Sequence, residues 1–482
     1  MDLTKKQPTL LLALIPIAVL IALLTLNVLV LGSDAITGPN QIALLLASGI
    51  AGVISFKLGY TWEEIEGSIV KSISSAMAAM LILLAIGSLS GTWLLSGIVP
   101  SMIYYGLKIL NPTIFLLAAC VISAIVSVAT GSSWSTVATV GIALLGIGKA
   151  MDISEGVIAG AIISGAYFGD KMSPLSDTTN LAPAMAGTDL FTHIKYMALT
   201  TFPTLGITLI IFFIWGFTLD TNQASADSSA VLLALEDKFS LNPLLFIVPI
   251  LVIVMIVKKV PALPALLIGA LLGGIAAIIF QPQIIEQVSG VKGDYLKASF
   301  IAVMNAMTTS INIQTSDPMI TELLTAKGMS GMLNTIWLIL CAMIFGGVME
   351  SCGLLKAIAE QIIKFAHSTG SLVASTAATC IFFNFTASDQ YMAIAVPGRM
   401  YADTYRKRGL KPEVLSRTLE DSGTVTSVLI PWNTCGATQA NVLGVATMVY
   451  APYTFFCIIS PLMTILQAYL NFKIRRLDDP KE

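Results

Sequence analysis

Long apolar stretches separated by short polar ones run through the chain from residue 10 to residue 470. A transmembrane helix needs about 20 mostly apolar residues. Stretches of this kind are predicted at 10–31, 40–57, 75–98, 156–190, 195–218, 243–257, 262–281, 331–352, 413–445 and 446–470. Two further segments, 112–149 and 369–408, are apolar with a polar middle, which predicts helical hairpins that enter the membrane and return. The pattern predicts an all-α polytopic membrane protein with about 10 full spans and two re-entrant hairpins.

The composition supports a membrane protein and excludes an ordinary soluble one. Of the 482 residues, 56% are hydrophobic and 11% are charged, whereas soluble domains carry about 25% charged residues. The net charge is −2 and the basic residues are scattered between the apolar spans, so no nucleic-acid-binding face is expected. The six cysteines stand singly and there are two histidines, which argues against a disulfide framework or a histidine-rich metal site. The first apolar run is longer than the roughly 7–15 residues of a signal-peptide core, so it is interpreted as a span.

A polar interruption inside the apolar stretch Gly160–Gly187 is the strongest local signal in the chain. Pro174 lacks an amide hydrogen and disfavours helix at the residue before it, so the helix is predicted to break there. Unwound backbone at membrane depth is tolerated only where protein or a water-filled cavity covers it. The freed carbonyls, with the side-chain oxygens between Asp170 and Asn180, suit a small hard cation such as sodium. The alternative is a polar loop that joins two helices.

Matching residues in the two halves of the chain indicate an internal repeat. Identical residues recur at a separation of 256 positions, which becomes 257 after one inserted residue. The pairs are Lys71 and Lys327, Gly91 and Gly347, Gly97 and Gly353, Thr130 and Thr386, Ser132 and Ser388, Val157 and Val414, and Pro174 and Pro431. The two prolines fall at the polar break of each half. We therefore predict a first repeat at 1–220, a linker at 221–241 and a second repeat at 242–482.

The distribution of lysine and arginine predicts which side of the membrane each loop faces. If Lys5 and Lys6 are cytoplasmic, most basic loop residues of the second half also fall on the cytoplasmic side, as do Lys473, Arg475 and Arg476. Both termini are then cytoplasmic, and the linker at 221–241 is extracytoplasmic. Equivalent elements of the two halves lie on opposite sides of the membrane, which is the arrangement of an inverted repeat.

Four polar segments, two from each half, are predicted to meet near the membrane midplane. They are the hairpin tips 130–136 and 384–390 and the broken spans at 170–180 and 420–436. Acidic residues at membrane depth cost at least about 2.5–3.5 kcal/mol and are usually functional. The predicted ion-coupling acids are Asp170, Asp177, Asp389 and Asp421. The predicted ligands for the ion or substrate are Ser132, Ser133, Ser173, Thr178, Thr179, Asn180, Asn384, Ser388, Asn433 and Thr434.

A sodium site is predicted within this set. Its members are Asp170, Asp177, Ser132, Thr178 and Asn180. A carboxylate can hold either a proton or a cation, and such competition is the basis of antiport. The structural alternatives are an ion pair with a lysine or arginine for Asp170 and a helix cap for Asp421.

Two stretches of the chain resemble the NhaC family of sodium/proton antiporters. The signature region of that family resembles GDKMSPLSDTTNLAPAMAGTDLFTHIKYM at 169–197, and its second conserved stretch resembles IPWNTCGATQA at 430–440. The resemblance implies a fold of two inverted repeats, each with a re-entrant hairpin and a broken helix. Such folds are associated with elevator movement of a transport unit against a scaffold. By this resemblance the transport unit is 112–190 and 369–445, and the scaffold is 1–98 and 242–281, which would also supply homodimer contacts.

The expected function is secondary antiport of Na⁺ and H⁺ across the cytoplasmic membrane, with no cofactor. Some relatives within this family couple sodium and protons to an exchange of malate for lactate, so a carboxylate exchanger is the alternative. Lys171 and Arg399 are the side chains available to such an anion. An intramembrane enzyme is the alternative from another class, and the inverted repeat argues against it. The chain has no P-loop motif, as a secondary transporter requires.

Overall fold

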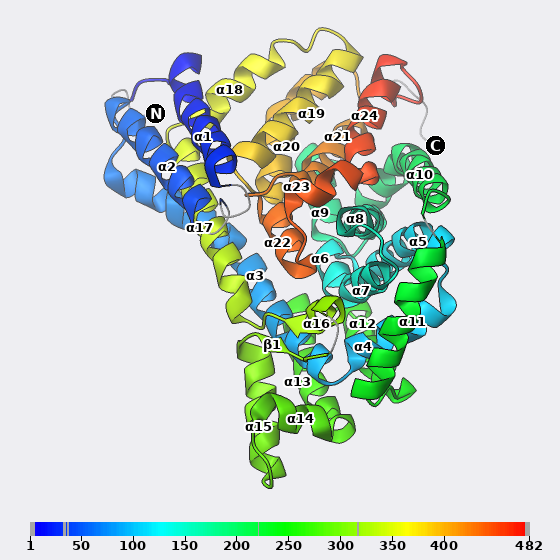
Figure 1. Cartoon of the computed structure of the whole chain (residues 1–482). Helices are drawn as coiled ribbons and strands as arrows, with labels where there is room; N and C mark the ends of the chain where they lie inside the picture. The colour runs from blue at the N-terminus through cyan, green and yellow to red at the C-terminus, as the bar shows by residue number, and fades with distance from the viewer. Residues whose placement is uncertain (1–4, 32–34, 36–37, 220, 316–317, 478–482) are drawn as a thin grey trace.

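The computed structural model describes residues 5–31, 35, 38–219, 221–315 and 318–477, and these form a bundle of helices (Figure 1). Two short strands, β1 (Ile311–Asn312) and β2 (Thr325–Ala326), form an antiparallel pair. The all-α class predicted from the sequence is confirmed.

The helices follow the order of the predicted apolar segments. Those of the first half are α1 (Leu10–Leu31), α2 (Pro39–Lys57), α3 (Trp62–Leu95), α4 (Ile98–Ile109), α5 (Pro112–Thr130), α6 (Ser133–Thr136), the π-helical η2 (Val137–Gly141), α7 (Ile142–Ala150), α8 (Glu155–Met172), α9 (Asp177–Ala186) and α10 (Leu190–Gly216). Those that follow are α11 (Thr221–Lys238), η3 (Pro243–Phe246), α12 (Ile247–Val257), α13 (Ala262–Phe280), α14 (Pro282–Ser289), α15 (Tyr295–Thr308), α16 (Pro318–Leu323), η4 (Ser330–Met332), α17 (Leu333–Ser351), α18 (Leu354–Ile363), α19 (Thr369–Thr386), α20 (Gln390–Lys407), α21 (Pro412–Leu419), the π-helical η5 (Glu420–Thr424), η6 (Ser427–Leu429), α22 (Thr434–Leu443), α23 (Thr447–Tyr450), η7 (Ala451–Tyr453) and α24 (Phe455–Tyr469).

Seven of the described helices are long and apolar enough to cross a membrane, or up to nine if each of two bent pairs is one span. The seven are α1, α2, α3, α5, α10, α13 and the helix at Ser330–Ser351 that contains α17. The bent pairs join Ser229–Lys238 to Pro243–Val257 at 95° and Thr447–Tyr453 to Phe455–Tyr469 at 54°. Two of the spans predicted from the sequence are divided in the structure, 156–190 into α8 and α9, and 413–445 into α21, η5, η6 and α22.

The helix break predicted at Pro174 is confirmed. α8 ends at Met172, and α9 begins at Asp177 after Ser176, whose hydroxyl accepts a hydrogen bond from the Thr179 amide (3.4 Å). In the second half, α21 continues into the π-helical turn η5, and α22 begins only at Thr434. Both predicted broken helices therefore contain irregular backbone in their polar segment.

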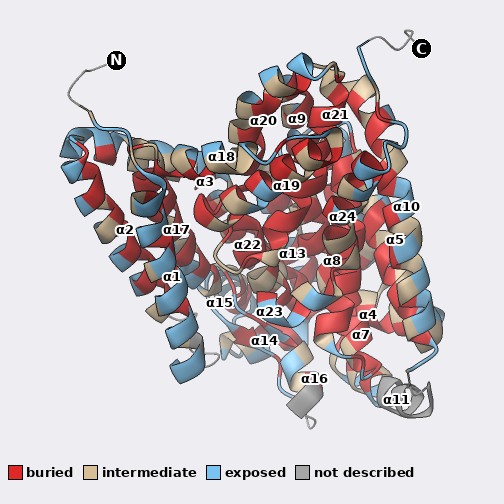
Figure 2. Ribbon diagram, turned by 90° about the horizontal axis from the view of Figure 1, so that it is seen from above, coloured by how far each residue is buried: buried red, intermediate tan, exposed pale blue. Residues whose placement is uncertain are grey.

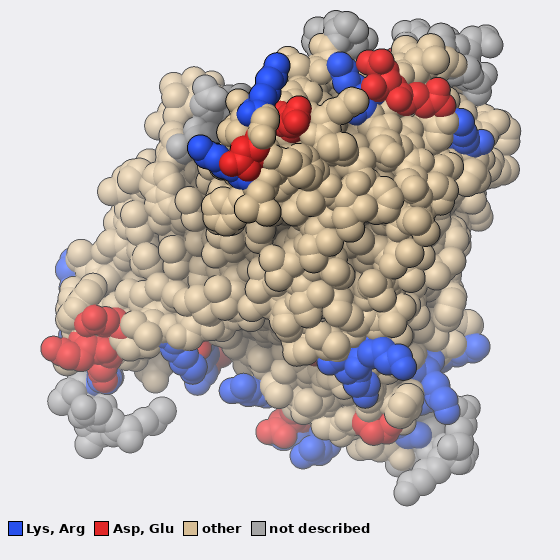
Figure 3. Space-filling model, turned by 90° about the horizontal axis from the view of Figure 1, so that it is seen from below, with Lys and Arg blue, Asp and Glu red and all other residues tan. Residues whose placement is uncertain are grey.

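The outer surface is apolar over a broad band. Figure 3 shows charged side chains at two opposite edges of the molecule, with a wide uncharged region between them. Large apolar side chains are exposed on several helices, for example Leu29, Ile214 and Ile279. Buried residues are concentrated around α8, α19, α22 and α24, whereas α1 at the edge is largely exposed (Figure 2). Such extensive apolar exposure is typical of a surface that faces lipid, so the chain is a multi-pass membrane protein.

Close packing of α5 on α8 fixes the part of the structure that holds the site. A side chain at Gly165 would overlap the carbonyl oxygen of Cys120, and one at Gly169 would overlap that of Ala124. The Ser127 hydroxyl of α5 also donates to the carbonyl oxygen of Ala166 in α8 (2.6 Å). The small residues let the two backbones approach, and this positions the end of α8 beside the turn that follows α5.

The predicted linker at 221–241 is largely helical. It forms α11, which lies beside α4, α5 and α7. Val231, Leu235 and Phe239 are buried in the same core as those helices. The two halves are therefore connected by a packed helix.

Candidate functional site

A cavity of about 660 Å³ lies where the polar segments of both halves meet. Its walls come from α3, from the turn between α5 and α6, from the break between α8 and α9, from the α12–α13 connection, and from the first residues of α20 and α22. Its polar lining includes Ser132, Asp170, Asp177, Thr178, Lys259, Asp389, Tyr391 and Thr434. The cavity therefore brings together three of the four predicted ion-coupling acids.

Asp170 is held at the carboxyl end of α8 by the start of α6. Its Oδ2 atom accepts hydrogen bonds from the amide (3.0 Å) and the hydroxyl (2.7 Å) of Ser133. Ser133 is presented by a tight turn, because Gly131 has a left-handed φ of 70° and Ser132 caps α6 through the Ser135 amide (3.2 Å). These contacts orient the Asp170 carboxylate at the cavity wall. The predicted alternative, an ion pair of Asp170 with a lysine or arginine, does not occur among the described residues.

Asp177 and Thr178 reach the cavity from the first turn of α9. Asp177 is exposed to the cavity, whereas Thr178 is buried. The Thr178 hydroxyl lies 3.1 Å from the Ser176 hydroxyl and donates to Oε1 of Glu420 (3.0 Å). The break in the first-half helix is thus joined directly to the π-helical turn of the second half.

The tip between α19 and α20 supplies the second-half groups. Ser388 has a φ of 58°, in the left-handed region, and Asp389 caps α20 by accepting from the Met392 amide (3.0 Å). The Thr434 amide donates to the Ser388 carbonyl oxygen (2.9 Å). Tyr391, two residues after Asp389, also lines the cavity, although its sequence position gave no signal of this.

Several predicted ligands stabilise the backbone around the cavity without lining it. Asn180 Nδ2 donates to the carbonyl oxygens of Pro174 (3.0 Å) and Ser176 (2.7 Å), so its side chain holds the break in place. The Ser173 hydroxyl donates to the Val128 carbonyl oxygen (2.8 Å). Of the five predicted sodium ligands, Asn180 is therefore the one that the structure does not bring to the cavity.

Three further predicted ligands also bond within the protein. The Thr179 hydroxyl donates to the carbonyl oxygen of Lys171 (3.1 Å). Asn433 Nδ2 donates to the carbonyl oxygen of Asn384 (3.0 Å), and Asn384 Nδ2 donates to that of Gly423 (2.6 Å). These amides tie the hairpin tip of the second half to its broken helix.

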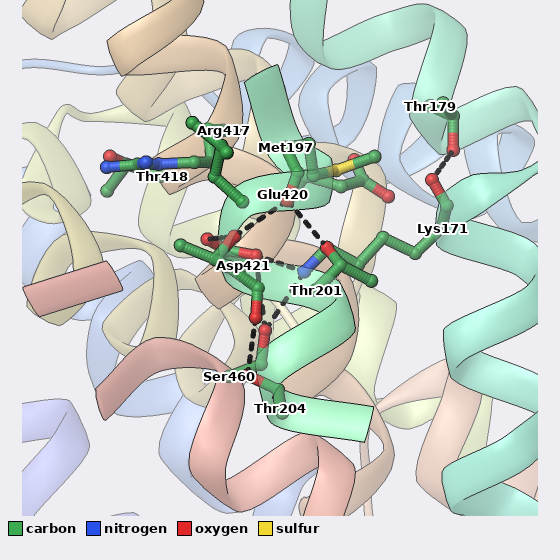
Figure 4. Close-up of polar contacts among 12 residues, drawn as sticks. Lys171, Thr179, Met197, Thr201, Thr204, Arg417, Thr418, Glu420, Asp421 and Ser460 are labelled. Carbon is green, nitrogen blue, oxygen red and sulfur yellow. Dashed lines mark hydrogen bonds and ion pairs between the residues drawn. The ribbon is translucent and has the colours of Figure 1, made fainter. Parts of the chain in front are cut away.

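Asp421 lies in a buried ion pair with Lys171, apart from the cavity (Figure 4). Both side chains are fully buried. Asp421 also accepts from the hydroxyls of Thr200 (2.9 Å) and Ser460 (3.2 Å), and Lys171 donates to Ser460 (3.0 Å). The suggested helix cap for Asp421 is not its role, and Lys171 is occupied by this pair.

Arg417 is a buried cation that the sequence analysis missed. Its guanidinium lies over the Tyr196 ring (4.4 Å to the centroid) and donates to Oε1 of Gln467 (3.2 Å). In Figure 4 it points away from Lys171. An arginine inside a predicted span is a functional or structural signal in itself, so its position in 413–445 could have identified it.

Comparison with known proteins identifies relatives along nearly the whole chain. The sequence profile described as the Na⁺/H⁺ antiporter family matches residues 165–472. The chain is 34% identical to the Na⁺/H⁺ antiporter NhaC of Alkalihalophilus pseudofirmus, over 98% of this chain and 97% of that protein. It is 35% identical to the Na⁺/H⁺ antiporter NhaC of Bacillus subtilis, over 89% of this chain and 92% of that protein. It is 36% identical to the malate-2H⁺/Na⁺-lactate antiporter of Bacillus subtilis, over 89% of each chain.

Proposed function

We propose that this chain, which belongs to the Na⁺/H⁺ antiporter family, exchanges Na⁺ for H⁺ at the carboxylates of the cavity. Its relatives are named as antiporters, so the protein is a transporter and not an enzyme. The observation that carries the residue assignment is the convergence of Asp170, Asp177 and Asp389 on one cavity.

In this proposal Na⁺ and H⁺ compete for the same carboxylate oxygens. Asp170 and Asp177 supply the negative charge, and the oxygens of Ser132 and Thr178 complete the coordination. Hydroxyl and carboxylate oxygens are the donors that hard cations prefer. Because both ions neutralise the same group, only one of them is carried by that group in each direction.

We further propose that the two halves are inverted repeats that move as an elevator. α9 and α22 begin and end 257 positions apart, at 177 and 434 and at 186 and 443. The cavity supports the moving unit of 112–190 and 369–445, because one wall comes from these residues and the other from α3 and the α12–α13 connection, within the scaffold ranges 1–98 and 242–281. Both termini are placed in the cytoplasm, and the early spans of each half form the homodimer contact.

Reconstitution into proteoliposomes tests this function. An inward Na⁺ gradient is expected to drive protons out of the vesicles, measured with an entrapped pH-sensitive dye. Asp170→Asn and Asp177→Asn are expected to abolish the proton movement. Asp403→Asn is the matched control, because its side chain is 83% exposed and forms an ion pair with Arg406 on the same helix. If both cavity variants exchanged ions like the wild type, the site would be wrong.

A carboxylate exchanger is the second candidate, on two observations. The chain is as similar to the malate-2H⁺/Na⁺-lactate antiporter as to the NhaC proteins, and a cavity of about 660 Å³ is large enough for a small organic molecule. The lining favours a cation, because it has three aspartates and, among the described lining residues, one lysine, Lys259. Assays with and without malate inside and lactate outside the proteoliposomes distinguish the two candidates. The primary proposal expects Na⁺-driven proton movement in the absence of both carboxylates, whereas an obligatory carboxylate exchanger would move protons only when malate is inside and lactate is outside.

A further inference from the structure

Glu420 is a buried acid with an incomplete set of hydrogen bonds. Its side chain is fully buried in the π-helical turn η5, and its Oε2 atom has no hydrogen-bond partner among the described groups. The buried Thr424 hydroxyl in the same turn also has none. A buried polar group with unmet hydrogen bonds destabilises a protein, and π-helical turns often occur at functional sites. A buried acid of this kind, in a π-helical turn, points to a role in transport.

The contact that Glu420 does make leads to the cavity. Its Oε1 atom accepts a hydrogen bond from the Thr178 hydroxyl (3.0 Å), and Thr178 lines the cavity beside Asp177. A hydroxyl has one hydrogen and two lone pairs. When the hydrogen is used by Glu420, the lone pairs of the Thr178 oxygen are left for other partners. The Ser176 hydroxyl lies 3.1 Å from this oxygen and can donate to one lone pair, which leaves one for a cation in the cavity that Thr178 lines.

The neighbouring charged groups leave Glu420 available for this contact. Lys171 is paired with Asp421 and bonded to Ser460. Arg417 bonds to Gln467.

We propose that Glu420 is a positioning residue for the cation site: it holds the Thr178 hydroxyl so that its oxygen lone pairs face the cavity. This inference rests on the proposed function and adds a residue from the second half to the first-half site. Groups that orient a ligand through its hydrogen commonly contribute 10–100-fold to metal affinity. Glu420 also links α9 to η5, so the geometry of the cation site depends on the contact between the two halves.

The test compares variants that keep or remove the acceptor. Glu420→Gln keeps an oxygen that can accept from Thr178, whereas Glu420→Leu removes it at similar volume. Thr178→Val removes the donor, and Thr178→Ser keeps it. Glu413→Gln and Thr418→Val are the controls, because both residues are buried in α21 and neither contacts the cavity. Equilibrium binding of radioactive Na⁺ to the purified full chain is measured together with Na⁺-driven proton movement.

Glu420→Leu and Thr178→Val are each expected to weaken Na⁺ binding and raise the KM for Na⁺ by about 10–100-fold, with kcat changed much less. Glu420→Gln and Thr178→Ser are expected to stay near the wild type. The double variant Glu420→Leu/Thr178→Val is expected to lose no more than either single variant, because both remove one contact.

Three results would overturn the inference. Glu420→Leu could bind Na⁺ like the wild type. Glu420→Gln could lose as much as Glu420→Leu, which would mean that Glu420 acts through its charge or its proton. The losses of the two single variants could multiply in the double variant. Failure of the proposed function is seen separately, as wild-type protein that moves no protons in response to Na⁺.

Discussion

The stability of the protein is expected to depend on the buried ion pair of Lys171 and Asp421. Both side chains are fully buried, and their other polar contacts come from Thr200 and Ser460. Lys171→Met leaves Asp421 with two hydroxyl donors and no counter-ion. Asp421→Leu leaves the Lys171 ammonium with the Ser460 hydroxyl as its one remaining polar partner among the described residues.

Removal of one partner from a buried ion pair typically destabilises a protein by about 3–5 kcal/mol. We expect the destabilisation by Lys171→Met to lie near the lower end of this range, because two hydroxyls still bond to the Asp421 carboxylate. The destabilisation by Asp421→Leu is expected to lie near the upper end. Replacement of both partners by apolar residues of similar volume is often neutral. The double variant Lys171→Met/Asp421→Leu is therefore expected to be more stable than either single variant.

The assay is thermal unfolding of the purified protein in detergent, followed by tryptophan fluorescence. The single variants are expected to lower the apparent melting temperature by several degrees, and the double variant is expected to recover most of that loss. Lys356→Met is the control, because Lys356 and Glu360 form an ion pair whose side chains are 69% and 54% exposed, and exposed pairs contribute about 0–1 kcal/mol. A double variant less stable than both single variants would refute the reasoning.

Two further predictions concern packing and pH. Gly165→Leu is expected to lower the melting temperature and the yield of folded protein, because its side chain would overlap the Cys120 carbonyl oxygen, whereas Gly206→Leu on α10 meets no atom within 4 Å and is expected to be neutral. Asp189 caps α10, and hydrogen bonds from the Thr192 side chain and backbone lower its pKa below the ordinary value of 3.8. Because the folded-state pKa is the lower one, the stabilisation is complete above pH 3.8 and is lost as the pH falls through the folded-state value. The melting temperatures of the wild type and Asp189→Ala are thus expected to differ at neutral pH and to converge below pH 3.8; a constant difference would contradict this.

The helical class and the position of the broken helix could be predicted from the sequence because both depend on local chemistry. Apolar runs of sufficient length predict spans, and Pro174 terminates α8 because it lacks an amide hydrogen. The internal repeat predicted that the polar segments containing Ser132, Asp170 and Asp389 meet near the membrane midplane, and all three residues line the cavity.

The partners of buried polar groups could not be predicted in the same way. Lys171 and Asp421 are 250 positions apart, and no periodicity relates them. Asn180 has the right chemistry for a cation ligand, but its side-chain amide instead donates to the carbonyl oxygens of Pro174 and Ser176 at the break. Which oxygen faces a cavity and which one bonds to the backbone is decided by tertiary packing.

The central claim is that Na⁺ and H⁺ compete for the carboxylates of Asp170 and Asp177. The most direct measurement is proton release when Na⁺ is added to the purified protein in weakly buffered detergent solution. The wild type is expected to release protons on addition of NaCl but not of choline chloride, and Asp170→Asn/Asp177→Asn is expected to release none. Equal proton release from the wild type and the double variant would contradict the account.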